Sequence, residues 1–283
     1  MTVLITGARG MLGRTLMLRL APEMSCVGID IGDCDITRPG QVDRCIAEAA
    51  PDVVLHCAAM TAVDACETRQ DEAWAVNAVG SANVAGACYR HGARLVAIST
   101  DYVFGGDLNR PYHEFDATNP RTVYGQSKLA GEQAVRRHCP NHVIARTAWL
   151  YGQGGPSFLH TMLRLASQDG PPLRVVNDQV GNPTSCEALA DGLRQILRTP
   201  IVGTVHLSCE GQSTWFEFTR EIFRLAGIAR EVVPCTTADF PRPAARPANS
   251  ALDKLVLRLQ GLTPMPRWQD ALKQFLKEHH NDL

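Results

Sequence analysis

The first half of the chain alternates between short apolar runs and longer stretches in which apolar residues recur with helical spacing. Runs that are apolar at successive positions are typical of strands buried on both faces of a parallel sheet. The predicted strands cover residues 2–6, 26–30, 53–57, 94–99 and 142–147. The predicted helices between them cover residues 12–20, 41–49, 71–91 and 120–138. This order predicts an α/β fold with a doubly wound parallel Rossmann sheet.

The pattern changes after Gly152, where polar turns separate shorter elements. We expect helices over residues 158–166, 186–197 and 267–277, a helix that Ser213 or Thr214 caps and that runs to Ala226, and short strands over 174–176 and 204–207. We therefore predict a dinucleotide-binding Rossmann domain over residues 1–150. A second, smaller α/β substrate domain would follow over residues 151–283, from which some segments could return to the first domain. A cleft between two such domains is a usual ligand site.

Composition narrows the function classes. Apolar residues make up 45% and charged residues 20% of the chain, as in ordinary soluble globular proteins. The net charge of -1 argues against a non-specific nucleic-acid binder, and no long uncharged apolar run predicts a membrane helix. The N-terminus lacks a signal-peptide pattern, and the ten cysteines are scattered without a Cys-x-x-Cys pair. We expect a cytoplasmic protein with reduced thiols that binds neither nucleic acid nor membrane.

Three glycines, Gly7, Gly10 and Gly13, occupy the turn between the first predicted strand and the first helix. Glycines at this place allow a tight turn and a close approach of the backbone to a pyrophosphate, while the helix N–H groups face the phosphates. Their position at the first strand-to-helix turn favours a dinucleotide site. A tight turn without a ligand is the alternative.

The adenosine end of such a cofactor would lie near the second strand. Asp30 ends that strand, near the position where an acid binds the ribose 2′-OH of NAD. Arg9 in the glycine turn could instead bind the 2′-phosphate of NADP, so both cofactors stay open. Asp35 and Ile36 could flank the adenine, although Asp35 could equally be a solvated loop acid. Ala59 is small enough to let the loop after the third strand pass close to the cofactor.

Tyr124 and Lys128 are four residues apart on a predicted helix, and therefore lie on one face. A nearby ammonium favours the phenolate, so the pair could exchange protons with a carbonyl or alcohol. An exposed helical face is the alternative. Thr100 follows the fourth strand, at the sheet edge where ligands bind, and could hydrogen-bond a substrate oxygen or simply cap a turn. All of these candidates belong to the same edge of one sheet.

These motifs resemble the extended short-chain dehydrogenase/reductase family, which shares the glycine turn, the Ser99-Thr100 strand end and the Tyr124-x-x-x-Lys128 pair. Longer strings spread over nearly the whole chain are similar to one branch, the dTDP-4-dehydrorhamnose reductase family. They are residues 62–64 with Glu67, 99–104, 123–132, 146–149, 177–179 with Gly181, 183–184 and 246–250. Dehydratases of the larger family carry an Asp-Glu pair after the threonine. Here Asp101 is followed by Tyr102, which favours simple reduction.

The resemblance implies roles for individual residues. Tyr124 would be the general acid, and Lys128 would hold the nicotinamide ribose and lower the tyrosine pKa. Thr100, Asp101 and Trp149 would contact the sugar. NADPH or NADH would be surrounded by Gly7, Gly10, Met11, Leu12, Asp30, Asp35, Ile36, Ala59 and Thr61.

The same resemblance implies a dTDP-sugar substrate, whose pyrophosphate needs a cation. Arg246 is the candidate because guanidinium binds phosphate bidentately, and a surface arginine in a proline-rich loop is the alternative. Asn249 would contact the substrate or brace the cleft. Some relatives dimerise through a magnesium ion held by helix carboxylates. Thr15 stands on the first helix where an acid would be expected, so we predict no metal site.

The expected reaction is reduction of the C4 carbonyl of dTDP-4-dehydro-6-deoxy-L-mannose to dTDP-L-rhamnose, by a monomer or homodimer. Another nucleotide-sugar 4-ketoreductase would keep the same catalytic residues and differ only in the shape of its pocket. A non-catalytic, dinucleotide-binding regulatory subunit is the second alternative, since the larger family includes one.

Overall fold

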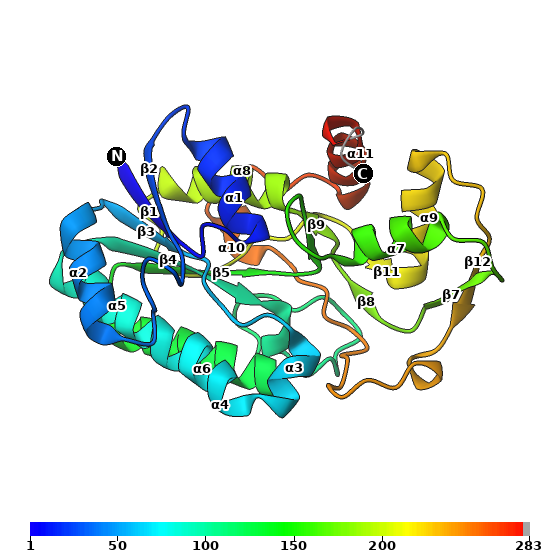
Figure 1. Cartoon of the computed structure of the whole chain (residues 1–283), viewed down its shortest axis with the longest axis horizontal. Coiled ribbons are helices and arrows are strands. Elements are labelled where there is room, and N and C mark those ends of the chain that lie inside the picture. The colour runs from blue at the N-terminus through cyan, green and yellow to red at the C-terminus, as the bar shows by residue number, and fades with distance from the viewer. Residues whose placement is uncertain (280–283) are drawn as a thin grey trace.

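The computed structural model describes residues 1–279, and a six-stranded parallel sheet forms its centre (Figure 1). The strands are β1 (Thr2–Thr6), β2 (Ser25–Ile29), β3 (Val53–His56), β4 (Arg94–Thr100), β5 (His142–Thr147) and β10 (Gly203–His206). They lie in the order β10-β5-β4-β3-β1-β2. The chain runs outward from β1 to β2 and then crosses to β3 on the other side of β1, so the strand order reverses at β1. This arrangement confirms the predicted doubly wound Rossmann sheet.

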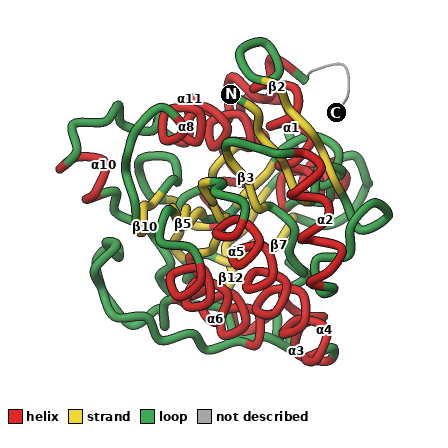
Figure 2. Tube along the Cα trace, turned by 90° about the vertical axis from the view of Figure 1, so that its left-hand side faces the viewer, coloured by secondary structure: helices red, strands yellow, loops and turns green. Residues whose placement is uncertain are grey.

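Helices cover both faces of the sheet, which explains why its strands are apolar at successive positions. Val3 and Ile5 pack into one core with α1 and α8, whereas Leu4 between them packs into a second core with α2 and α5. In Figure 2 the strands lie between α1 and α8 on one side and α5 and α6 on the other. The bounds of these helices are α1 (Met11–Leu20), α2 (Pro39–Ala49), α5 (Ser81–Arg90), α6 (Val123–His138) and α8 (Cys186–Leu197).

The second half of the chain builds a smaller region beside the carboxyl ends of the strands, at the right of Figure 1. Three two-stranded pairs support it, β7 with β12, β8 with β11 and β6 with β9. Thr214 caps α9 through a reciprocal capping box with Glu217. Both α8 and β10 return from this half to the central sheet. The remaining bounds are β6 (Leu150–Tyr151), α7 (Phe158–Ala166), β7 (Leu173–Val176), β8 (Val180–Gly181), β9 (Thr184–Ser185), β11 (Ser213–Thr214), α9 (Trp215–Ala226), β12 (Val232–Cys235), η3 (Thr237–Asp239), α10 (Leu255–Leu259) and α11 (Trp268–Glu278).

The single helix predicted over residues 71–91 is divided into three segments. It begins as α4 (Gln70–Trp74), widens into the π-helix η1 (Ala75–Gly80) and continues as α5. A short helix, α3 (Val63–Thr68), precedes it, and the 3₁₀ turn η2 (Asp101–Val103) follows β4. Single turns of π-helix frequently mark functional sites, and this one lies against α6.

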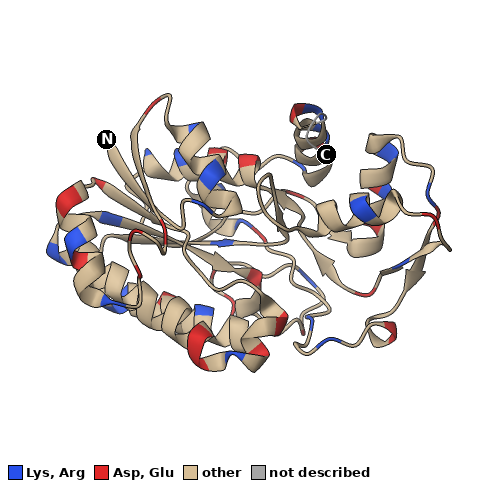
Figure 3. Cartoon of the chain, in the orientation of Figure 1, with Lys and Arg blue, Asp and Glu red and all other residues tan. Residues whose placement is uncertain are grey.

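The charged residues are distributed over the periphery. Figure 3 shows both signs interspersed along the outer helices, while the strands of the central sheet carry few charges. Within residues 1–279, no helix is long and apolar enough to span a membrane.

Candidate active site

A cavity of about 820 Å³ opens at the carboxyl ends of β1, β3 and β4, where the strand order reverses. Three of the five expected substrate residues line it, namely Thr100, Asp101 and Trp149. Every expected cofactor residue also lines it: Gly7, Gly10, Met11, Leu12, Gly13, Asp30, Asp35, Ile36, Ala59, Thr61, Tyr124 and Lys128. The fold thus brings segments that lie far apart in the sequence around one space.

The glycine turn forms a backbone cradle at one end of the cavity. Gly7 has a φ of 68°, in the left-handed region that favours glycine. A Cβ on Gly13 would lie 2.2 Å from the Gly7 carbonyl oxygen, so only glycine permits this approach. Gly10 precedes α1 without a side-chain cap, which leaves the first N–H groups of the helix without a side-chain partner. These features fit a pyrophosphate.

Beyond the cradle, Asp30 and Arg9 lie at the end of β2. The Asp30 carboxylate accepts hydrogen bonds from the backbone N–H groups of Arg9 and Ile31, both at 2.8 Å. The Arg9 guanidinium is exposed and pairs with Asp33 at 3.2 Å. The cavity therefore has an anchored acid and an exposed cation at this end, and its geometry suits either form of the cofactor.

Asp35 shapes the loop that carries Ile36. Its Oδ1 accepts hydrogen bonds from the Thr37 backbone N–H and hydroxyl at 3.0 and 2.7 Å, and its Oδ2 lies 3.3 Å from the Arg38 guanidinium. The hydrogen bonds to Thr37 are the main reason that the pKa of Asp35 is lowered. Asp35 is therefore an anchored turn residue and not a freely solvated acid.

Tyr124 and Lys128 are both buried on the inner face of α6. Thr122 begins this helix by accepting a hydrogen bond from the Gly125 N–H at 3.0 Å. The Lys128 ammonium donates to the Ile98 carbonyl at 2.8 Å, and burial lowers the pKa of Lys128 to about 8.

The pKa of Tyr124 shifts in the direction opposite to our expectation. Burial raises the pKa of this phenol well above its usual range, and the neighbouring Thr100 hydroxyl opposes the rise only in part. Burial therefore dominates the pKa shift, and Tyr124 carries its proton at neutral pH. This is the state that a proton donor needs.

Thr100 and Asp101 form a hydrogen-bonded pair beside Tyr124. The Thr100 hydroxyl donates to Asp101 Oδ1 at 2.9 Å and accepts from the Tyr102 backbone N–H at 3.1 Å. The Asp101 side chain is buried, with 3% of the residue exposed. Burial raises the pKa of Asp101 to about 6.

Asn77 supports the site from behind the cavity wall, and the sequence analysis assigned it no role. It is buried on η1 and holds Met60 twice, accepting from the Met60 N–H at 2.9 Å and donating to the Met60 carbonyl at 3.1 Å. It also donates to the Ser127 hydroxyl at 3.0 Å. Asn77 thus ties the loop that carries Ala59 to the helix that carries Tyr124. In the sequence, the one sign of this role was a polar amide side chain in the middle of a predicted helix.

Trp215 lines the cavity and was not among the predicted site residues. Its ring stacks on that of Trp149, with centroids 3.4 Å apart and planes within 3°. Its Nε1 donates to Gln179 Oε1 at 3.0 Å. Trp149 has a φ of 47°, in the left-handed region that bulky residues rarely occupy. The two rings form one wall of the cavity.

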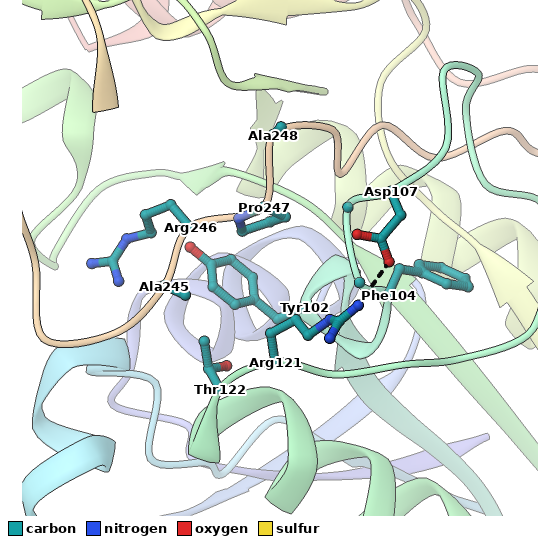
Figure 4. Close-up of a pocket in the computed structure, with 11 residues that line it drawn as sticks. Tyr102, Phe104, Asp107, Arg121, Thr122, Ala245, Arg246, Pro247 and Ala248 are labelled. Atoms are coloured by element: carbon teal, nitrogen blue, oxygen red, sulfur yellow. Dashed lines mark hydrogen bonds and ion pairs between the residues drawn. The ribbon is translucent and has the colours of Figure 1, made fainter. Parts of the chain in front are cut away.

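Arg246 and Asn249 do not line this cavity. Arg246 pairs with Asp64 at 2.8 Å and borders a second, smaller cavity of about 280 Å³ (Figure 4). Tyr102 lines both cavities, so they adjoin. The Asn249 amide donates to the carbonyls of Leu108 and Arg110 at 2.7 and 2.9 Å. Through these bonds Asn249 braces the loop after β4.

Within residues 1–279, no group of three or more His, Cys, Asp and Glu side chains is arranged to hold a metal ion. Thr15 lies on α1, and its hydroxyl donates to the Met11 carbonyl at 3.1 Å.

Comparisons with known proteins agree over nearly the whole chain. The family model described as "RmlD substrate binding domain" matches residues 1–281. The chain is 43% identical to a Streptomyces griseus protein named dTDP-4-dehydrorhamnose reductase, over 96% of this chain and 91% of the relative. It is also 43% identical to a Streptomyces antibioticus protein named "Probable dTDP-4,6-dihydroxy-2-methyloxan-3-one 4-ketoreductase", over 96% and 93%. The solved structure of a Bacillus anthracis dTDP-4-dehydrorhamnose reductase in complex with NADP has a TM-score of 0.95 at 41% identity, over 98% of this chain and 99% of that one.

Proposed function

The chain belongs to the RmlD substrate binding domain family, and we propose from this premise that it reduces the C4 carbonyl of dTDP-4-dehydro-6-deoxy-L-mannose to give dTDP-L-rhamnose. One observation carries the proposal. A single cavity joins a pyrophosphate cradle to a buried Tyr124, Lys128 and Thr100, in a chain that is 43% identical to a named reductase of this substrate class.

NADPH or NADH would occupy the cavity between the glycine cradle and α6, and supplies a hydride when bound. Gly7, Gly10 and Gly13 would place the backbone against the pyrophosphate, as their close approaches allow. Lys128 would bind the nicotinamide ribose through an ammonium already held by the Ile98 carbonyl. Arg9 supports use of the phosphorylated cofactor, because its guanidinium is exposed and pairs with the exposed Asp33 in the loop after β2.

Tyr124 would donate the proton that the new alcohol requires. Its raised pKa keeps the phenol protonated, and a pKa lowered to about 8 still leaves Lys128 mostly charged at neutral pH. That charge would stabilise the tyrosinate that remains after proton transfer. Thr100, next to Tyr124, would hydrogen-bond the reacting oxygen and so help to orient the carbonyl.

The sugar would lie between Thr100, Asp101 and the wall of Trp149 and Trp215. Arg246 would bind the pyrophosphate from the adjoining cavity, where the anion would have to share the guanidinium with Asp64. Asn249 would support this site indirectly, because its bonds hold the loop after β4 against the C-terminal segment.

Substrate-dependent oxidation of NADPH, followed at the absorbance band of the reduced nicotinamide, tests this function. A second keto-sugar is worth assaying in parallel, because one relative at 43% identity is named as a different 4-ketoreductase. Higher kcat/KM for dTDP-4-dehydro-6-deoxy-L-mannose would support the proposal. Higher kcat/KM for the other keto-sugar would reassign the substrate while keeping the catalytic residues.

We also propose a cytoplasmic location and a monomeric or homodimeric state. All ten cysteines lie within residues 1–279 and are free thiols there, which supports a reducing compartment. Light scattering of the purified protein would decide between monomer and dimer.

A further inference from the structure

The Thr100 hydroxyl meets two competing demands in this site. It has a single proton to donate, and that proton is directed at Asp101 Oδ1, 2.9 Å away. Its oxygen already accepts the Tyr102 N–H at 3.1 Å. The proposed reduction needs the same proton to point at the substrate oxygen. Thr100 cannot donate this proton to Asp101 and to the substrate at the same time. A change in a neighbouring group must therefore reorient the hydroxyl.

Asp101 is placed to control this choice. It is buried, lines the cavity and forms no ion pair within residues 1–279. Its Oδ2 has no hydrogen-bond partner there either. Tyr102 from η2, Tyr124 from α6 and Ser250 from the C-terminal segment face it. The ion pair between Arg246 and Asp64 also acts on Tyr102, which neighbours Asp101.

We propose, on the basis of the proposed function, that Asp101 is a positioning residue whose protonation decides where the Thr100 proton points. When ionised, Asp101 accepts the Thr100 proton. When protonated, it donates to Thr100 across the same contact, and Thr100 turns its own proton toward Tyr124 and the reacting oxygen. The protonated form is therefore the productive one.

The protonated form is accessible near neutral pH. Burial raises the pKa of Asp101 to about 6, although the neighbouring Ser250 and Thr100 side chains oppose part of this rise. Two pyrophosphates bound in the adjoining space would bring more negative charge, which raises the pKa of the carboxyl further.

The pH dependence of kcat in D101N tests the proposal. Asparagine has the shape of a protonated aspartate, and its amide donates to Thr100 at every pH. Wild-type kcat should fall first as Asp101 ionises and again near pH 8, as Lys128 loses its proton. In D101N the first decrease should be absent, and the second decrease near pH 8 should remain. The ratio of the D101N kcat at about pH 7.5 to that at about pH 5.5 should exceed the wild-type ratio by on the order of 20-fold, because a carboxyl with a pKa of about 6 loses that much of its protonated form between these two pH values. A D101N profile with the wild-type shape would overturn the proposal.

A second measurement does not depend on turnover. Protein labelled with carbon-13 at the aspartate carboxyls can be titrated by NMR, with the Asp101 signal identified by its absence in D101N. The Asp101 pKa should be raised, and Thr100→Val should raise it further because the charged form loses its donor. An unshifted Asp101, or no change in T100V, would overturn the proposal. If the enzyme failed to reduce any keto-sugar while this titration held, only the proposed function would be lost.

Discussion

Gly13→Ala should abolish tight cofactor binding while the protein stays folded. The new Cβ would lie 2.2 Å from the Gly7 carbonyl oxygen and 2.7 Å from the Ala8 Cα, and both of these are backbone atoms. The turn must move by about 1 Å to restore an ordinary contact, and a misplacement of about 1 Å can cost on the order of 100-fold in a preorganised site. Overpacking of this kind costs about 1–3 kcal/mol of stability, less than the total of about 5–15 kcal/mol typical of a domain.

Quenching of tryptophan fluorescence by NADPH would measure the affinity, and urea unfolding would measure the stability. Gly40→Ala is the matched control, because Gly40 also lies in a helix and a Cβ there would meet nothing within 4 Å. We expect the NADPH Kd to rise by roughly 100-fold in G13A and to stay near wild type in G40A. A G13A protein that is folded and binds NADPH normally would refute the claim that the glycine turn binds the cofactor pyrophosphate.

Three further predictions concern the catalytic helix and its support. Tyr124→Phe should lower kcat by roughly 10²–10⁴-fold and leave the NADPH Kd nearly unchanged; turnover close to wild type would remove Tyr124 from the acid role. Since burial lowers the pKa of Lys128 to about 8, the KM for NADPH should rise as the pH increases through that value, and a KM that is flat to pH 10 would contradict the ribose contact. Glu132→Gln breaks a buried ion pair with Arg146 at 2.7 Å and should lower the free energy of unfolding in urea by about 3–5 kcal/mol. Glu221→Gln is the control at an exposed ion pair and should lower it by less than about 1 kcal/mol. Equal losses of stability would show that burial does not set the difference.

Local patterns predicted the sheet and the residues that line one end of the cavity, for physical reasons. Buried parallel strands are apolar at successive positions, and the glycine turn has a close approach that only Gly13 permits. These signals lie within a few residues of each other. Because parallel strands end at one edge, the position of Thr100 followed from the fold.

The features that were missed depend on contacts between distant segments. Periodicity does not distinguish η1 from an ordinary helix, so the amide bonds of Asn77 to Met60 and Ser127 were not foreseen. Asn249 braces a loop more than a hundred residues away. The pKa direction of Tyr124 was wrong because sequence spacing shows the nearby lysine and not the depth of burial.

Transfer of isotope from the cofactor tests the central claim most directly. The protein would be incubated with NADPH that carries deuterium at C4 of the nicotinamide and with dTDP-4-dehydro-6-deoxy-L-mannose, and the product would be examined by NMR. The account predicts dTDP-L-rhamnose with deuterium at sugar C4 and at no other carbon. Cofactor that keeps its label, or a product labelled elsewhere, would contradict reduction of the C4 carbonyl by this site.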